Sequence, residues 1–320
     1  GVVVKNDQTT YVDVSLKPQA IETDVVEVIA YKVPLIDPGE TSSKQTVTAE
    51  QIKDLPTRNI QSIASTTAGV YQDDEGGGIN VRGGRGDGVV YYVDGIRVSG
   101  EVNLPVSAVE QIDVVTGGVP ARYGDATAGV INVTTKGAPS TFSGGVEFQS
   151  SLDRWRFDLV NFNLSGPILK DKETGRAKIG YAIFAEYQRQ LDPRPSAVDM
   201  FKVKDDVFQE LQDNPLVRDE SGNIFTRAEF LRAEDLEVNR IKRNTVDNEA
   251  RVNAKFDFQL ADNMTLTLGG NATYEHFHNW IQAYSLLNYE NNPLFRVWNG
   301  RGFARFTHNV SQGRNEEDRK

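Results

Sequence analysis

The feature that most constrains this chain is an alternation of apolar and polar side chains in the segments that follow Gly137. Successive side chains of a β-strand point to opposite faces, so the alternation predicts long strands with one apolar and one polar face. The clearest segment carries the apolar set Ala250, Val252, Ala254, Phe256, Phe258 and Leu260. The other strands are expected near residues 142–149, 160–165, 179–187 and 264–274, with a weaker candidate at 304–310, which makes about six strands.

The five connections between these strands run roughly short, medium, very long, very short and long. The second and fourth are residues 170–177 and 261–263, and the third and fifth are residues 191–248 and 281–300. Strands of membrane-spanning β-barrels are joined by short turns on the periplasmic side and longer loops on the outer side. The pattern predicts that the second and fourth connections face the periplasm and that residues 191–248 form a long extracellular loop.

The long connection contains signals of local structure. Thr226 to Glu229 predicts a capping box at the start of a helix, and Phe225 with Phe230 predicts the hydrophobic contact that accompanies one. Ser196 to Asp199 predicts the start of another helix. An elaborated surface loop is a common place for contact with a ligand or a partner.

Residues 46–137 have a different pattern, typical of a small α+β domain rich in glycine. Short helices are expected to start at Thr48 and Asn59, and several short strands follow. Asp94-Gly95 lies between two apolar runs and predicts a tight β-hairpin. Ahead of this domain, residues 1–18 predict a hairpin that ends a β-sandwich domain, and residues 19–45 predict a linker.

Composition narrows the possible functions. The chain has no Cys, which excludes disulfides, thiolate catalysis and Cys-ligated metals. Its net charge of −10 argues against nucleic acid as a partner. We find no paired catalytic groups and expect neither an enzyme nor a cofactor. A metal site at His276 and His278 is conceivable, but a place in an interfacial aromatic belt beside Phe277 and Trp280 is favoured, so no metal site is predicted.

Four motifs of the middle segment resemble one family, the TonB-dependent outer-membrane receptors. Ile79-Asn80-Val81-Arg82-Gly83 resembles the Ile-x-Ile-Arg-Gly element of their plug domain, and Val93-Asp94-Gly95 with Val98 resembles the Val-Asp-Gly-x-x-Val hairpin. The other two are similar to the Ile-Glu-x-Ile-Glu-Val strand and to the closing element of the plug; they are Val109-Glu110-Gln111-Ile112-Asp113-Val114 and Ala121-Arg122-Tyr123-Gly124 followed by residues 128–136.

The resemblance implies an α+β plug domain at residues 46–137, followed at 138–320 by transmembrane antiparallel β-barrel strands. A plugged transporter barrel has about 22 strands, so we expect the barrel to be incomplete in this chain. In such receptors the plug fills the barrel pore. The implied location is the outer membrane of a Gram-negative bacterium, with the plug and the N-terminus facing the periplasm. The leading hairpin resembles the carboxypeptidase-regulatory-like sandwich that precedes the plug in Bacteroidetes-type receptors.

The implied function is TonB-energised import of a scarce, unidentified ligand across the outer membrane. The alternatives are an adhesion, signalling or secretion-associated role on the same scaffold, or a soluble β-rich binding domain of the envelope. Expected partners are TonB, outer-membrane lipids, the ligand, and a surface lipoprotein or other envelope protein. The candidate TonB-binding segment, or Ton box, is Asp24, Val25, Val26, Glu27, Val28, Ile29, Ala30 and Tyr31.

The plug-motif residues that the resemblance singles out are Arg82, Gly83, Asp94, Gly95, Arg122 and Gly124. One departure concerns the Leu-Arg-Gly-Pro element that many members carry before the closing element. Here residues 115–120 read Val-Thr-Gly-Gly-Val-Pro, without that Arg. An ion pair between plug and barrel at this point is therefore in doubt, although Arg82 can still serve.

Overall fold

The computed structural model describes residues 42–73, 78–100, 102–171, 177–261 and 263–309. The chain divides into two compact units, Gly1–Lys136 and Gly137–Lys320. The predicted hairpin at 1–18, the Ton box at 24–31 and nearly all of the linker lie outside the described residues. The predicted domain boundaries therefore stay predictions.

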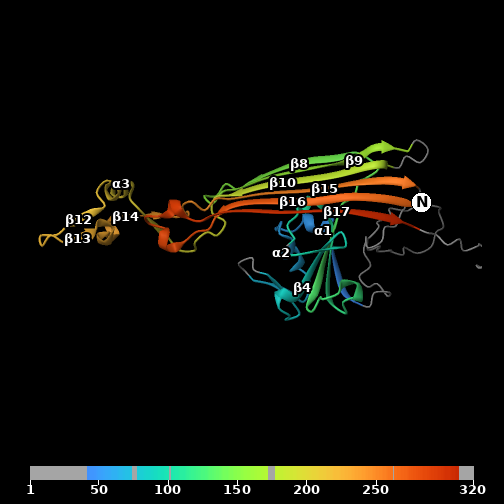
Figure 1. Ribbon diagram of the computed structural model, residues 1–320, viewed down its shortest axis with the longest axis horizontal. Helices are drawn as coiled ribbons and strands as arrows, with labels where there is room; N and C mark the ends of the chain where they lie inside the picture. The colour runs from blue at the N-terminus through green and yellow to red at the C-terminus, as the bar shows by residue number, and fades with distance from the viewer. Residues whose placement is uncertain (1–41, 74–77, 101, 172–176, 262, 310–320) are drawn as a thin grey trace, which may run out of the picture. The chain divides into compact units, whose positions relative to one another are not determined.

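The first unit is built on a five-stranded mixed sheet with the order β1-β6-β7-β4-β5, in which only β4 and β7 run parallel. Its strands and helices, in chain order, are β1 Ser43–Thr48, α1 Ala49–Lys53, α2 Ile60–Ala64, β2 Val70–Gln72, β3 Ile79–Val81, β4 Val89–Val93, β5 Ile96–Val98, β6 Val109–Gly117 and β7 Gly129–Thr135 (Figure 1).

Both short helices of this unit begin where the sequence predicts. The Thr48 hydroxyl accepts a hydrogen bond from the Gln51 amide, and the Gln51 side chain accepts one from the Thr48 amide at 2.9 Å. The Asn59 side chain accepts from the Ser62 amide at 3.0 Å and caps α2. These bonds satisfy amide groups that a helix start leaves without an intrahelical partner.

Aliphatic side chains from the helices and the sheet form the core of this unit. Ile63 of α2, Ile112 of β6 and Ile131 of β7 are fully buried, and further members are Ile52, Ile60, Ile79, Val81, Val93, Leu104, Val114 and Val133. No sequence signal predicts β1, because only its last two residues, Val47 and Thr48, are buried. Pairing with β6 makes these residues a strand.

The second unit contains a six-stranded antiparallel sheet with the order β17-β16-β15-β10-β9-β8. Its strands are β8 Ser143–Ser150, β9 Phe157–Lys170, β10 Ala177–Gln190, β15 Asp247–Ala261, β16 Met264–His278 and β17 Leu294–His308. The strands expected from the alternation are confirmed, and β17 begins about ten residues earlier than the weak sequence signal suggested. Within the part of the chain that the structure describes, β8 and β17 are the open edges of the sheet.

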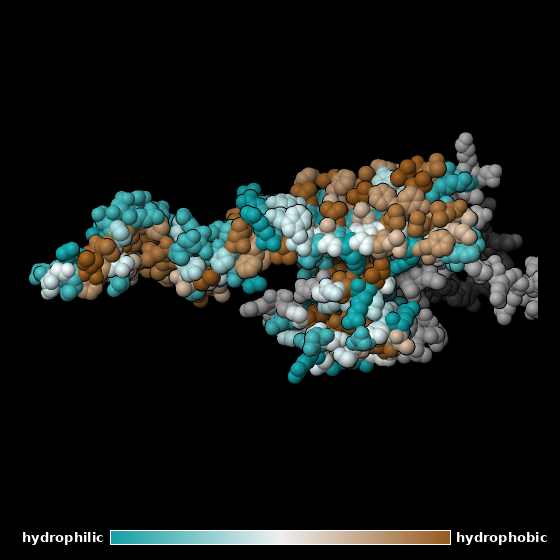
Figure 2. Space-filling view, in the orientation of Figure 1, coloured by the Kyte–Doolittle hydropathy of each residue, from teal (hydrophilic) through white to brown (hydrophobic). Residues whose placement is uncertain are grey.

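The register keeps one apolar and one polar face across all six strands. A typical apolar row runs from Phe148 through Val160, Tyr187, Ala250 and Tyr274 to Trp298. Both ends of this row are exposed: Phe148 keeps 77% of its accessible surface and Trp298 keeps 73%. Figure 2 shows apolar residues, in brown, gathered over the strands of this sheet.

The connections leave the sheet at two ends. Residues 171–176 and 262–263 connect strands at one end, while residues 151–156, 191–246 and 279–293 connect them at the other. All long connections therefore lie at one end of the sheet, as the sequence predicts. Among the described residues, no helix has the length and apolar character needed to cross a membrane.

The longest connection folds into a small structure of its own, which we call the arm (residues 191–246). Its elements are β11 Met200–Val203, α3 Asp205–Asp213, β12 Leu216–Arg218, β13 Ile224–Thr226 and β14 Leu236–Asn239. β11 pairs with β14, and β12 pairs with β13. Lys202 bonds Glu237 at 2.7 Å and Asp205 at 3.2 Å, and these bonds raise the pKa of Lys202.

Two local predictions for the arm are wrong. Thr226 makes no capping bond; it ends β13 opposite Leu216, and a 3-10 turn follows at Arg227–Phe230. The expected contact between Phe225 and Phe230 is present, with ring centroids 6.1 Å apart. No helix starts at residues 196–199, because the chain there leads into β11, and α3 begins at Asp205. Strand pairing overrides the local helix signals in both places.

Candidate functional site

The predicted hairpin carries the first group of motif residues. Asp94 and Gly95 have φ angles of 51° and 75°, which is the left-handed geometry of a type I′ turn between β4 and β5. Asp94 also has a second role that the sequence did not reveal. Its carboxylate accepts from the Thr135 amide at 2.9 Å and from the Thr135 hydroxyl at 2.8 Å. The buried carboxylate thus fastens the hairpin to the end of β7.

Arg82 and Gly83 follow β3 in left-handed conformations, with φ of 48° and 76°. The Arg82 amide donates to the Gly69 carbonyl at 2.8 Å, which holds the turn. The guanidinium lies against Gly117 so closely that a Cβ there would approach Nη1 to 2.4 Å. Arg82 therefore places a cation beside Thr116-Gly117, within the element that lacks the Arg of many family members.

The glycines that follow Arg82 allow tight packing. A Cβ on Gly84 would come within 2.6 Å of the Ala128 side chain, and one on Gly88 within 2.5 Å of the Thr127 hydroxyl. Both positions need glycine because the segment packs against the start of β7. Residues 84–88 are consequently a packed turn.

The closing element packs on the opposite side of β7. Tyr123 is buried beside Val115 and Val130, and its ring meets Tyr92 edge-on at 5.0 Å. Arg122 stacks over the Tyr123 ring at 4.8 Å and donates to its hydroxyl at 3.1 Å. Gly124 then ends the turn, and a Cβ at this position would meet no other atom within 4 Å. Arg122 and Gly124 thus lie near the surface, while the neighbouring tyrosine anchors the element.

Lys136 ends the closing element. Its ammonium group donates to the Ser107 carbonyl at 2.8 Å. Burial lowers the pKa of Lys136, since desolvation disfavours its charged form.

The polar face of the six-stranded sheet carries a buried ion-pair network that sequence analysis missed. The Arg251 guanidinium bonds Glu186 directly opposite on β10 at 2.7 Å, and it also bonds both carboxylate oxygens of Glu249. Asn161 donates to Glu186 at 3.2 Å, and Gln188 donates to Glu249 at 2.9 Å. The alternation places these residues on the polar face, but only the register brings them together.

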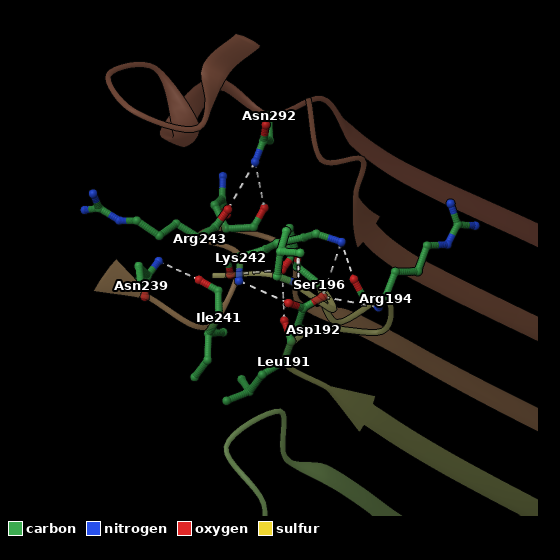
Figure 3. Close-up of polar contacts among 12 residues, drawn as sticks. Leu191, Asp192, Arg194, Ser196, Asn239, Ile241, Lys242, Arg243 and Asn292 are labelled. Carbon is green, nitrogen blue, oxygen red and sulfur yellow. Dashed lines mark hydrogen bonds and ion pairs between the residues drawn. The ribbon is translucent and has the colours of Figure 1, made fainter. Parts of the chain in front are cut away.

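A second polar cluster, which we call the hub, joins the base of the arm to the connection at 279–293 (Figure 3). Asp192 is 1% exposed and accepts from the Lys242 amide at 3.0 Å. Asn292 donates to the carbonyls of Arg243 and Asn244, both at 3.2 Å. The Arg243 guanidinium lies 3.4 Å above the Tyr289 ring. These contacts hold the two long connections together at one end of the sheet.

The predicted His pair lies on β16. The His276 and His278 ring centroids are 6.2 Å apart, and His276 stacks on Tyr274. Among the described residues, no group of three or more His, Asp or Glu is arranged to hold a metal ion.

The plug motifs and the six-stranded sheet were compared with known proteins. Residues 39–130 match the TonB-dependent Receptor Plug Domain family. The TonB-dependent transporter Oar of Myxococcus xanthus is 30% identical over 162 residues, which cover 46% of this chain and 15% of Oar. The probable TonB-dependent siderophore receptor PirA of Acinetobacter baumannii is 28% identical over 174 residues, which cover 45% of this chain and 22% of PirA. The chain thus spans less than a quarter of the length of either relative.

The architecture agrees with that assignment. The structure of FpvA from P. aeruginosa aligns with 86% of this chain and 33% of its own, with a TM-score of 0.57 at 16% identity. This likeness concerns the fold, which is a plug domain together with β-barrel strands. The motif residues at 82–83, 94–95 and 122–124 lie inside the matched range of the plug family. Residues 39–130 therefore carry the plug domain of TonB-dependent receptors, and the chain as a whole resembles these receptors in fold, with a plug domain followed by strands of a β-barrel.

Proposed function

We propose that this protein imports a scarce ligand across the outer membrane with energy delivered by TonB. The observation that carries the proposal is the plug domain at residues 39–130, with its hairpin locked to β7 by Asp94. Relatives named as a TonB-dependent transporter and a siderophore receptor support it. These names describe transport and reception, so we also propose that the protein does no chemistry on its ligand.

Transfer of energy from TonB requires a segment of the receptor that TonB can bind. We propose that residues 24–31 bind TonB by adding a strand to the edge of its sheet. Val25, Val26 and Val28 have high strand propensity, and main-chain hydrogen bonds carry this kind of recognition whatever the side chains. Pro34 and Pro38 follow the segment and disfavour its pairing further along the chain.

The six-stranded sheet would supply part of the wall. Its apolar face suits contact with lipid, and its polar face, with Arg251 and its two carboxylates, suits the interior of a barrel. The arm and the hub lie at the end of the sheet with the long connections, which we assign to the cell exterior. A ligand or an envelope partner such as a surface lipoprotein would meet the arm first.

The test is capture of the full-length protein by the periplasmic domain of TonB. Val26→Pro removes a backbone donor and fixes φ, so it should lower capture by about tenfold or more, while Val26→Ala keeps the donor and should change it little. Equal capture of the Pro variant would remove residues 24–31 as the TonB-binding segment. Failure of the unmodified protein to bind TonB would favour an adhesion, signalling or secretion-associated role on the same scaffold.

A further inference from the structure

A polar row crosses the apolar face of the six-stranded sheet near the end where the arm leaves it. Arg189 of β10 lies opposite Asn248 of β15, Asn248 lies opposite His276 of β16, and His276 lies opposite Arg296 of β17. Each is two residues beyond a member of the row that runs from Tyr187 to Trp298, so the four side chains share its face. We call these four residues the rim row.

The two Arg side chains of the rim row are available to an outside partner. Both are exposed. The Arg296 side chain has no hydrogen bond or ion pair with any residue that the structure describes. Arg189 lies opposite Asp158 and interacts with its charge, but the hydrogen bonds of that carboxylate go to Arg156 at 2.9 Å and Ser150 at 2.7 Å. Two guanidinium groups thus remain at the border of an apolar surface.

The row that runs from Tyr187 to Trp298 indicates how deep the rim row would lie in a membrane. Tyr187 directs its hydroxyl to the Asn248 side chain at 3.0 Å, and Tyr274 and Trp298 have ring centroids 4.3 Å apart. Tyr and Trp with an apolar body and a polar tip favour the boundary between acyl chains and headgroups. The rim row lies about 7 Å further out along the strands, which is the depth of the headgroups.

The opposite end of the same face has a different character. The row there consists of Ile179, Phe258, Leu266 and Phe306, all apolar. On β10, β15, β16 and β17, both Arg of this face therefore lie at the end with the long connections. Such an asymmetry distinguishes one membrane leaflet from the other.

We propose that Arg189, His276 and Arg296 form a binding site for the phosphate-bearing headgroup of an outer-leaflet lipid. The inference rests on the membrane-spanning role proposed above. Guanidinium groups bind phosphate oxygens through paired hydrogen bonds, and an anionic headgroup would complement the charge of the two Arg. Asn248 and His276 lie between them and supply further polar groups. Arg189 and Arg296 are three strand spacings apart, about 14 Å, so the row offers a headgroup several points of contact.

The experiment uses the full-length receptor in neutral nanodiscs or detergent, titrated with a bis-phosphorylated lipid A or with inorganic phosphate. Binding is read by native mass spectrometry and by tryptophan fluorescence. The double variant Arg189→Gln with Arg296→Gln should bind the lipid about fivefold more weakly for each Arg removed. The matching double Lys variant should retain most of the binding. Arg305→Gln is the matched control, because Arg305 is exposed on the same strand as Arg296 but on the other face.

Loss of lipid binding in the double Gln variant, with Arg305→Gln unchanged, supports the site. Unchanged binding in the double Gln variant, or an equal loss in Arg305→Gln, overturns it. Competition by inorganic phosphate as strong as that by lipid A also overturns it, because the site would then take free anions. Resistance of the barrel to SDS at room temperature confirms that each variant is folded. The titration involves neither TonB nor a transported ligand. A negative result would therefore overturn the lipid site without changing the outcome of the TonB capture experiment.

Discussion

The two units of the chain distribute their side chains in opposite ways. The plug unit buries Ile112 and Ile131 completely, as a water-soluble domain does. The sheet unit leaves Phe148 and Trp298 largely exposed, yet Arg251 and Glu186 are only 7% and 3% exposed. Apolar side chains are thus buried in the first unit and exposed on one face of the sheet in the second, where charged side chains are buried on the other face. The contrast teaches that the plug is stabilised by apolar burial, whereas the sheet relies on its register and on paired charges.

The largest effect is expected from breaking the buried charge network of the sheet. Arg251→Met removes the cation between Glu186 and Glu249, and two buried carboxylates then face each other without compensation. We expect a loss of about 3–5 kcal/mol in the free energy of unfolding. The measurement is urea unfolding of the full-length receptor in lipid vesicles, followed by tryptophan fluorescence. The matched control Arg305→Gln, on the same face but outside this network, should stay within about 0.5 kcal/mol.

A matched pair of isoleucines sharpens the contrast between apolar burial and apolar exposure. Ile131→Ala opens a cavity in the plug core and should lower its unfolding free energy by about 2–5 kcal/mol. Ile179→Ala on β10, where the side chain is partly exposed in the apolar row with Phe258 and Leu266, should have an effect below about 1 kcal/mol because lipid chains refill the space. Hydrogen exchange of the full-length receptor reads both units separately. Similar losses in the two variants would contradict the assignment of the apolar face to lipid.

Sequence patterns revealed those parts of the fold that depend on local chemistry. Alternation predicted the six strands, and the capping residues Thr48 and Asn59 predicted two helix starts. β1 was missed because its pairing with β6 depends on tertiary contact and only its last two residues are buried. The helix start predicted at Thr226 was wrong for the same reason, because Thr226 pairs with Leu216 and is a strand residue.

The sequence predicted which residues belong to the candidate site but did not predict how they are arranged. The resemblance singled out Arg82, Asp94 and Arg122, but a sequence does not show that Arg82 lies over Gly117 or that Asp94 binds Thr135. These contacts join residues that are far apart in the sequence. The rim row likewise depends on the register of four strands, which no single segment encodes.

A smaller loss of stability is expected from removing the hydrogen bonds between Asp94 and Thr135 in the plug domain. Asp94→Ala removes both carboxylate oxygens that accept hydrogen bonds from Thr135. It also leaves an Ala at a positive φ, with no side-chain hydrogen bond to stabilise that conformation. The expected loss in the plug is about 2 kcal/mol. Asp94→Asn keeps one acceptor and tolerates the left-handed conformation, so it should lose about half as much. Faster hydrogen exchange at the ends of β4 and β7 is the readout, and an Asn variant as damaging as the Ala variant would show that charge is the essential property.

The smallest effect belongs to the arm, which follows neither pattern because most of its surface meets water. Asp219 caps the turn between β12 and β13: its carboxylate accepts from the Asn223 amide at 2.7 Å and from the Asn223 side chain at 2.9 Å. The side-chain bond from Asn223 is the main cause that lowers the pKa of Asp219. A carboxyl whose pKa is lower in the folded state contributes stability above its unfolded pKa of about 3.9 and loses it as the pH falls through the folded value. The turn should therefore loosen only below about pH 4, which amide chemical shifts of Gly222 and Asn223 can follow. Asp219→Asn should abolish this pH dependence, and a turn that loosens near neutral pH would instead point to a different titrating group.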